Sequence, residues 1–189
     1  MEYFLGPDAE KVFLENHEKL SAESDRGAVI LSASLLDSAL EDNLKAFLLS
    51  PVNKNDELFS GRGAPLGTFS SKIEMCYRLG IISVGVRSQL NKFKAIRNDF
   101  AHNLDSAKLD DEANKDRMLA ILRSEPGIPQ ALNSIVIQGG TKCDKSFEKN
   151  LLDGFGSRHT FNLLFAVVCM WLKRSAISIE KINYFEQKS

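Results

Sequence analysis

Apolar side chains recur every three to four residues along most of this sequence, while the strict alternation typical of strands is nearly absent. That spacing is the period of helices that bury one face. It predicts helices over 7–22, 25–50, 105–122 and 157–182, and a pair of helices joined by a short turn over 68–102. We therefore expect an all-α protein, a helical bundle with a long central helix at 25–50.

Residues with special roles at helix ends support these boundaries. Thr68 and Ser83 are good N-terminal caps for the two helices of the pair, and Gly80 stands where a left-handed residue would end the first. Ser157 starts the last helix in the same way, and Pro51 ends the central one. The sequence thus marks the ends of the helices as well as their buried faces.

The run LLFAVVCMWL, at 163–172, is apolar on almost every side of the last helix, so other helices must surround it. It has about half of the roughly 20 residues that cross a bilayer. The start of the chain, MEYFLGPDAEKVF, has no basic segment followed by an apolar one. We expect a core helix, no membrane span and no secretory signal, and hence a cytoplasmic protein.

One segment breaks the helical pattern. Residues 126–144 contain two prolines and a Gly-Gly pair, which signal turns. We interpret this segment as an insertion packed on the bundle, in which SIVIQ would form a short strand. With 189 residues, of which 43% are hydrophobic and 26% charged, the chain is otherwise an ordinary globular sequence, and we expect one domain over 1–189.

The formal net charge is only -1. This argues against a surface devoted as a whole to nucleic acid, so any phosphate-binding role must be local. The three cysteines, Cys76, Cys143 and Cys169, are odd in number and far apart, which fits neither a disulfide framework nor paired zinc ligands. We interpret them as reduced thiols.

The stretch AIRNDFAHNL, 95–104, places polar residues where an amphipathic helix ends. Asn98 and His102 are four residues apart and lie on one face of the helix, with Arg97 rotated by about 100° from Asn98. A helix C-terminus also favours a positive charge, which suits His102 to a role as an acid or a phosphate ligand. We expect the three side chains to border one cleft.

This group has two interpretations. In the first, Arg97, Asn98 and His102 form a site for chemistry on phosphates. In the second, the arginine makes salt bridges and the Asn/His pair caps the helix, so that they hold the bundle together around a buried, hydrogen-bonded histidine. Residue types alone favour the structural interpretation.

Charge along the chain adds candidates for binding. The segment 75–98 has five basic residues and no acidic one. Of these, Arg87, Lys92 and Lys94 are candidate binding residues beside Arg97. The alternative is a solvated helical face, which is the usual role of such a stretch.

Two carboxylates and two histidines complete the set of candidates. Asp37 and Glu41 are four residues apart on the central helix, and they either point a carboxylate pair at the same cleft or form a solvated face, which is the commoner arrangement. His17 and His159 have no partners at ligand spacing, so we expect no metal site and no cofactor.

Three segments, taken in order, resemble a known family. They are SDRGAVILSASLLDSALEDNL, LFSGRGAPLGTFSSKIEMCYRLGIIS and KAIRNDFAHNLD, and together they look like the mannitol operon repressor (MltR) family over 24–110. The segment 64–73, APLGTFSSKI, carries most of the resemblance. It implies an all-helical regulator of carbohydrate uptake that acts on transcription through protein partners. Because the sequence has no helix-turn-helix with a basic recognition helix, we expect no direct reading of operator DNA.

The residues RNDFAH also resemble the arginine-to-histidine signature of HEPN-type helical domains, many of which are metal-independent ribonucleases. The resemblance implies a homodimer in which these residues of two protomers meet across a cleft. His102 would then move protons at an RNA 2′-hydroxyl or at the leaving oxygen, Arg97 would stabilise phosphorane charge, and Asn98 would orient the histidine. Non-catalytic HEPN-like domains keep the same residues, so the signature also fits a scaffold.

Two functions follow as hypotheses, both on a HEPN-like or MltR-like bundle that forms a homodimer. The first is a non-enzymatic transcriptional regulator that binds other proteins. The second is a metal-independent endoribonuclease, as in a toxin module, with Arg97 and His102 catalytic. The expected partner is a protein in the first and RNA in the second.

Overall fold

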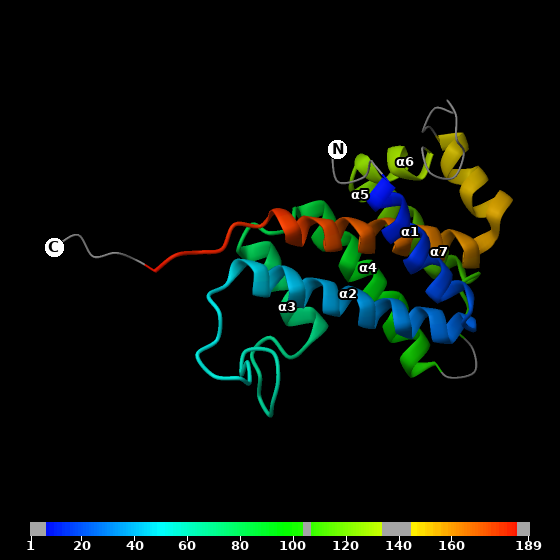
Figure 1. The fold of residues 1–189 in the computed structure, drawn as a ribbon. Helices are drawn as coiled ribbons and strands as arrows, with labels where there is room; N and C mark the ends of the chain where they lie inside the picture. Colours follow the sequence, from blue (N-terminus) through cyan, green and yellow to red (C-terminus); the bar gives the residue numbers. More distant parts are fainter. Residues whose placement is uncertain (1–6, 104–106, 134–144, 185–189) are drawn as a thin grey trace.

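A computed structural model describes residues 7–103, 107–133 and 145–184. Within these ranges the chain forms seven helices and no strand, which confirms the all-α prediction (Figure 1). The helices are α1 (Pro7–Ser21), α2 (Asp25–Phe47), α3 (Phe69–Arg78), α4 (Val84–His102), α5 (Glu112–Ser124), α6 (Gly127–Leu132) and α7 (Lys145–Ser178).

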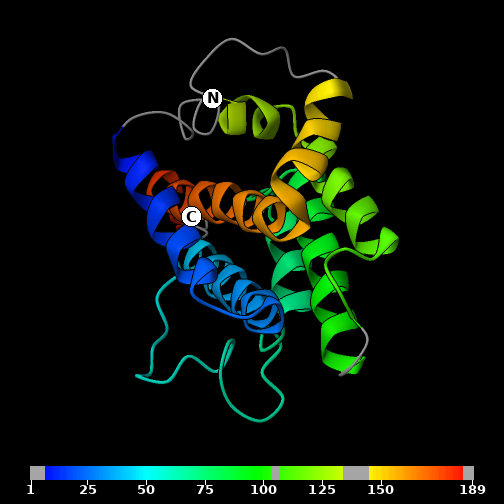
Figure 2. The same cartoon turned by 90° about the vertical axis from the view of Figure 1, so that its right-hand side faces the viewer.

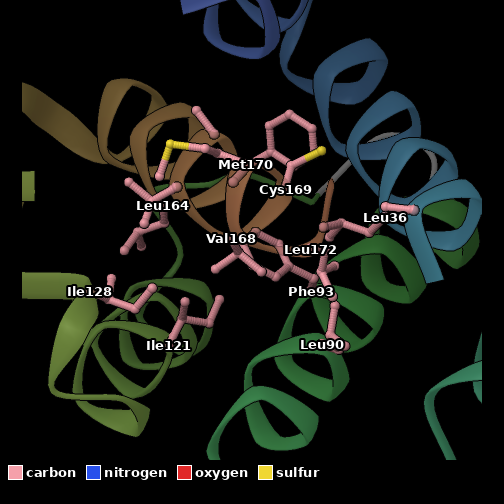
Figure 3. Close-up of a cluster of buried hydrophobic side chains, with 14 of the residues drawn as sticks. Leu36, Leu90, Phe93, Ile121, Ile128, Leu164, Val168, Cys169, Met170 and Leu172 are labelled. Atoms are coloured by element: carbon pink, nitrogen blue, oxygen red, sulfur yellow. The ribbon is translucent and has the colours of Figure 1, made fainter. Parts of the chain in front are cut away.

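The second half of α7 lies at the centre of the bundle. Every side chain from Thr160 to Met170 is buried, because α1 and α2 pack on one side of α7 while α5 and α6 pack on the other (Figure 2). Figure 3 shows side chains from α2, α4, α5 and α6 gathered around Val168 and Leu172. This arrangement explains why α7 is apolar on nearly every side.

By length and composition alone, Leu151–Ser178 could cross a membrane. In this fold, 72% of its apolar window is buried inside the bundle, so the other helices cover it.

The helix ends follow the local chemistry. Thr68 and Ser71 form a reciprocal capping box at the start of α3, and the Ser83 hydroxyl accepts a hydrogen bond from the Val86 amide at the start of α4. Gly80 is in the left-handed region, with φ of 73°. The predicted helical pair over 68–102 is therefore found with its expected turn.

Several boundaries differ from the sequence prediction. The helix expected over 105–122 begins only at Glu112, because residues 107–111 are not helical. The helix expected over 25–50 ends at Phe47, because Leu48 turns to an extended conformation. The last helix begins at Lys145 and is interrupted at Gly156, whose φ of 77° and ψ of 159° are not helical. Ser157, the predicted cap, therefore starts only its second half, and the helix ends at Ser178.

The segment 126–144 is not wholly irregular, so its interpretation as a loop insertion is wrong in part. Residues Gly127–Leu132 form α6, whose Ile128 and Leu132 are buried. Burial of these apolar side chains against α5 and α7 favours a helical turn in spite of Pro129, which is tolerated in the first turn. The proposed SIVIQ strand lies outside the described residues.

Polar contacts at both ends of α2 fix it against its neighbours. The Asn43 amide donates to the carbonyl oxygen of Leu172 at 2.8 Å and accepts from the Ser175 hydroxyl at 2.9 Å, which joins α2 to α7. At its other end, Arg26 donates to the carbonyl oxygens of Phe100 and Asn103, which joins α2 to the end of α4. These bonds set the position of the stretch that carries the RNDFAH residues.

Candidate functional site

An open cleft of about 410 Å³ lies between α2, the start of α3 and the second half of α4. Lys94, Arg97 and Asn98 line it from α4, and Asp37 lines it from α2. Its lining also includes Ile30, Ala33 and Phe69, so the cleft combines charged, polar and apolar groups.

The two cations in this cleft are held only weakly by the fold. Arg97 is exposed, and its guanidinium donates to the side-chain oxygen of the adjacent Asn98 at 3.2 Å. It makes no ion pair with any described residue. Lys94 donates from Nζ to the hydroxyl of Ser70, 3.1 Å away. Both positive charges therefore face the cleft without a carboxylate partner in the described chain.

His102 does not join this cleft. It is the last residue of α4, its side chain is exposed, and it makes no hydrogen bond to a described residue. The structure thus brings Arg97 and Asn98 together on the cleft but places His102 outside its lining. The expectation that all three border one cleft is met only for the first two.

The structural interpretation of the RNDFAH residues required a buried, hydrogen-bonded histidine. In the described chain, the contact that holds this part of α4 to the bundle comes instead from the nearby residue Asp99, which forms an ion pair with Arg117. This ion pair ties α4 to α5, and Arg117 also donates to the side-chain oxygen of Asn114, 2.8 Å away within α5. The arginine and histidine of the signature are left at the surface.

Asp37 and Glu41 both contact Lys72 of α3, a residue that is not among the candidates predicted from the sequence. Lys72 Nζ lies 3.0 Å from Oδ2 of Asp37 and 2.7 Å from Oε2 of Glu41. The lysine side chain is only 4% exposed. The two carboxylates are therefore neither a solvated face nor a pair aimed at the RNDFAH residues. Only Asp37 also lines the cleft.

Charge compensation explains how this lysine is tolerated. Burial acts to lower the pKa of Lys72, but its hydrogen bonds to the two carboxylates outweigh that effect and raise the pKa above its usual range. Burial likewise acts to raise the pKa of Glu41, yet Lys45 and Lys72 lower it on balance. The sequence contains a signal for this burial. Lys72 stands four residues before the buried Cys76, so it lies on the apolar face of its helix.

The other predicted cations are not gathered at the cleft. Arg87 bonds to Glu74 with Nε at 2.9 Å and a terminal nitrogen at 2.8 Å, and it lies over the Tyr77 ring. Lys92 is half-buried and does not line the cleft. Of the candidate binding residues on α4, only Lys94 shares the cleft with Arg97.

Thiols and histidines offer no second site in the part of the chain that is described. Burial raises the pKa of Cys76 to about 12 and of Cys169 to about 11, so both thiols are poor nucleophiles. Cys143 lies outside the described residues. His17 and His159 stack edge to face at 5.2 Å. No group of three or more metal-ligating side chains occurs within the described ranges.

Comparison with known proteins gives no match to a family model, to a curated protein or to a solved structure.

Proposed function

We propose that this protein is a non-enzymatic regulator that acts by binding another protein, and that the cleft beside Arg97 is its binding surface. One observation carries this proposal. The Arg97 side chain is exposed at the cleft and has no carboxylate partner in the described chain. A charge that stabilises no part of the fold is available for a partner. On this proposal the partner presents a carboxylate, which an arginine binds with charge-assisted hydrogen bonds.

The mixed lining of the cleft favours a protein over a nucleic acid. A phosphate backbone is best bound by a surface of one sign, whereas here the Asp37 carboxylate shares the cleft with Arg97 and Lys94. One Asp37 oxygen, Oδ1, is buried without a hydrogen-bond partner among the described residues. Because that oxygen is buried, a partner would bind the cleft through an acid at Arg97 and Lys94 and through apolar side chains at the apolar part of the lining.

The resemblance to the mannitol operon repressor family over 24–110 gives this binding a biological setting. We propose that the protein works in the cytoplasm as a homodimer and influences the transcription of carbohydrate-uptake genes through its partner. It would not read operator DNA by itself. This part of the proposal depends on the resemblance and not on the cleft.

Affinity capture with matched variants tests the binding surface. Wild-type protein, Arg97→Glu and Lys92→Glu would each be immobilised and exposed to lysate of the source cells. Lys92 is the control, because it lies on the same helix and outside the cleft. We expect a partner that binds wild type and Lys92→Glu and is lost with Arg97→Glu. Equal retention by Arg97→Glu would contradict the proposal.

One observation favours a second function, a HEPN-type endoribonuclease. Arg97 and His102 are both exposed, so both are free to meet the same residues of a second protomer across a dimer cleft. One histidine would accept the proton of the 2′-hydroxyl as it attacks phosphorus, the arginines would stabilise the phosphorane, and the second histidine would protonate the leaving oxygen.

An RNA cleavage assay separates the two functions. Mixed single-stranded RNA would be incubated in EDTA with wild-type protein or with the Arg97→Ala/His102→Ala double variant. The binding proposal predicts no cleavage by either. Fragments ending in 2′,3′-cyclic phosphate that appear only with wild type would make the protein a ribonuclease and overturn the leading proposal.

A further inference from the structure

A second and smaller pocket, of about 140 Å³, lies near the N-terminal end of α4, where the turn between α5 and α6 meets α7. It shares no lining residue with the Arg97 cleft. Its walls are mainly apolar and include Val86, Ile128, Val168 and the half-buried Trp171. Figure 3 shows Ile128 and Val168 within the surrounding core cluster. A dry, apolar cavity of about 150 Å³ is large enough to bind benzene.

One carboxylate borders this apolar space. Glu125 is half-buried and accepts a hydrogen bond from the Ser83 hydroxyl, and it makes no ion pair with any described residue. The nearby Arg123 does not neutralise it, because its guanidinium binds Glu148 with contacts of 2.6 to 3.1 Å. Since no described cation pairs with this carboxylate, a positively charged ligand can bind it with a charge-assisted hydrogen bond.

The lack of a side chain at Gly85 leaves room for Glu125 at this position. A Cβ atom at residue 85 would meet the Glu125 carboxylate and lie 2.5 Å from the Ser124 carbonyl oxygen. The absence of a side chain at Gly85 therefore allows the α5–α6 turn to approach the start of α4. The buried Gln89 also lines the pocket, but its amide nitrogen donates to the Ile121 carbonyl oxygen at 3.1 Å within the fold.

We propose that this pocket binds a small organic amine, with its apolar body between Trp171 and the aliphatic side chains and its ammonium group on Glu125. The size of the pocket limits the ligand to about the size of benzylamine. The carboxylate supplies a charge-assisted hydrogen bond, and the indole ring adds attraction for a cation. This site is independent of the proposed protein-binding function.

Trp171 is the only tryptophan, so its fluorescence reports on this pocket directly. We would titrate the full-length protein with benzylamine, and with toluene and benzoate as neutral and anionic compounds of similar shape. We expect a saturable change with benzylamine at a dissociation constant on the order of 1 mM. Toluene should bind about tenfold more weakly, and benzoate more weakly still.

The variant Glu125→Gln tests the role of the carboxylate, and its amide oxygen can still accept from Ser83. Benzylamine should bind it about tenfold more weakly while toluene binding is unchanged. Unchanged toluene binding would also show that the pocket is intact in this variant. Glu57→Gln is the control, because Glu57 is exposed and lines a different pocket. The proposal is overturned if no compound gives a saturable change, if toluene binds wild type as tightly as benzylamine, or if Glu125→Gln binds the amine normally.

Discussion

Lys72 Nζ donates a 2.7 Å hydrogen bond to Oε2 of Glu41, although the lysine side chain is almost completely buried. The contact joins α3 to α2, and Asp37 adds a second acceptor at 3.0 Å. Removing one carboxylate would leave a buried ammonium group with only half of its compensation. The position of α3, and with it one wall of the Arg97 cleft, depends on this arrangement.

Glu41→Gln should lower the free energy of unfolding at pH 7 by about 1–3 kcal/mol, since the buried ammonium group of Lys72 loses one of the two negative charges that compensate it. Because Lys45 and Lys72 hold the pKa of Glu41 below its usual range, its stabilising effect is fully present above about pH 4.3 and is lost as the pH falls through the lower folded-state value. Urea unfolding of both proteins at several pH values measures this difference.

Asp42→Asn is the matched control, because Asp42 is exposed on the same helix. It should leave the stability at pH 7 nearly unchanged. A stability gap between wild type and Glu41→Gln that stayed constant far below pH 4 would show that the gap comes from packing and not from the charge.

Arg97→Ala and His102→Ala should each change the free energy of unfolding by less than about 0.5 kcal/mol, because neither side chain supports the fold in the described chain. Arg117→Ala should cost about 1–2 kcal/mol, because it breaks the ion pair with Asp99 and the hydrogen bond to Asn114. Chemical denaturation of the three variants compares these costs. If His102→Ala were as damaging as Arg117→Ala, the histidine would have a structural role after all.

Gly156→Ala should destabilise the protein by about 1–3 kcal/mol, because φ of 77° with ψ of 159° is a conformation that only glycine adopts readily. Gly154→Ala, two residues earlier in the helical part of α7, should be neutral or stabilising by up to about 1 kcal/mol, since nothing lies near its added Cβ. Thermal and urea unfolding would show the contrast. Equal effects at the two positions would mean that the interruption of α7 is not needed.

The pKa of His17 leads us to expect a second pH dependence of the free energy of unfolding. Burial, followed by the charge of His159, lowers the pKa of His17. The unfolded chain therefore binds a proton more readily, and stability should decrease as the pH falls below about 6.5. His17→Phe should remove part of this decrease, and the difference is measured by unfolding at pH 7.5 and pH 5.5, on the order of one unit either side of the usual histidine value. An identical pH response in the variant would assign the decrease to other groups.

Local signals in the sequence predicted much of the fold. Each helix-end feature depends only on residues within four positions of it, so a short stretch of sequence is enough to predict it. These features are the capping box at Thr68, the left-handed Gly80 and the cap at Ser83. The apolar period likewise indicated α1 to α5 and the core role of α7, but it missed α6. The boundaries at Phe47 and Lys145 were missed, because burial against distant helices decides where a helix stops being favourable.

The candidate site was predicted only in part, for the same reason. The i and i+4 spacing placed Asn98 near His102, but it could not show which of them would line a cleft formed with α2 and α3. The ion pair of Asp99 with Arg117 and the burial of Lys72 depend on contacts between helices that are far apart in sequence.

By itself, the sequence determined the class of the fold, the faces of the helices and the chemistry available at RNDFAH, since these follow from periodicity and residue type. Only the tertiary structure decided which charges are neutralised and which stay exposed. The physical reason is that the cost of a charge depends on its burial and on its partner. Both are set when the helices pack, which buries Lys72 between two carboxylates and leaves Arg97 at the surface.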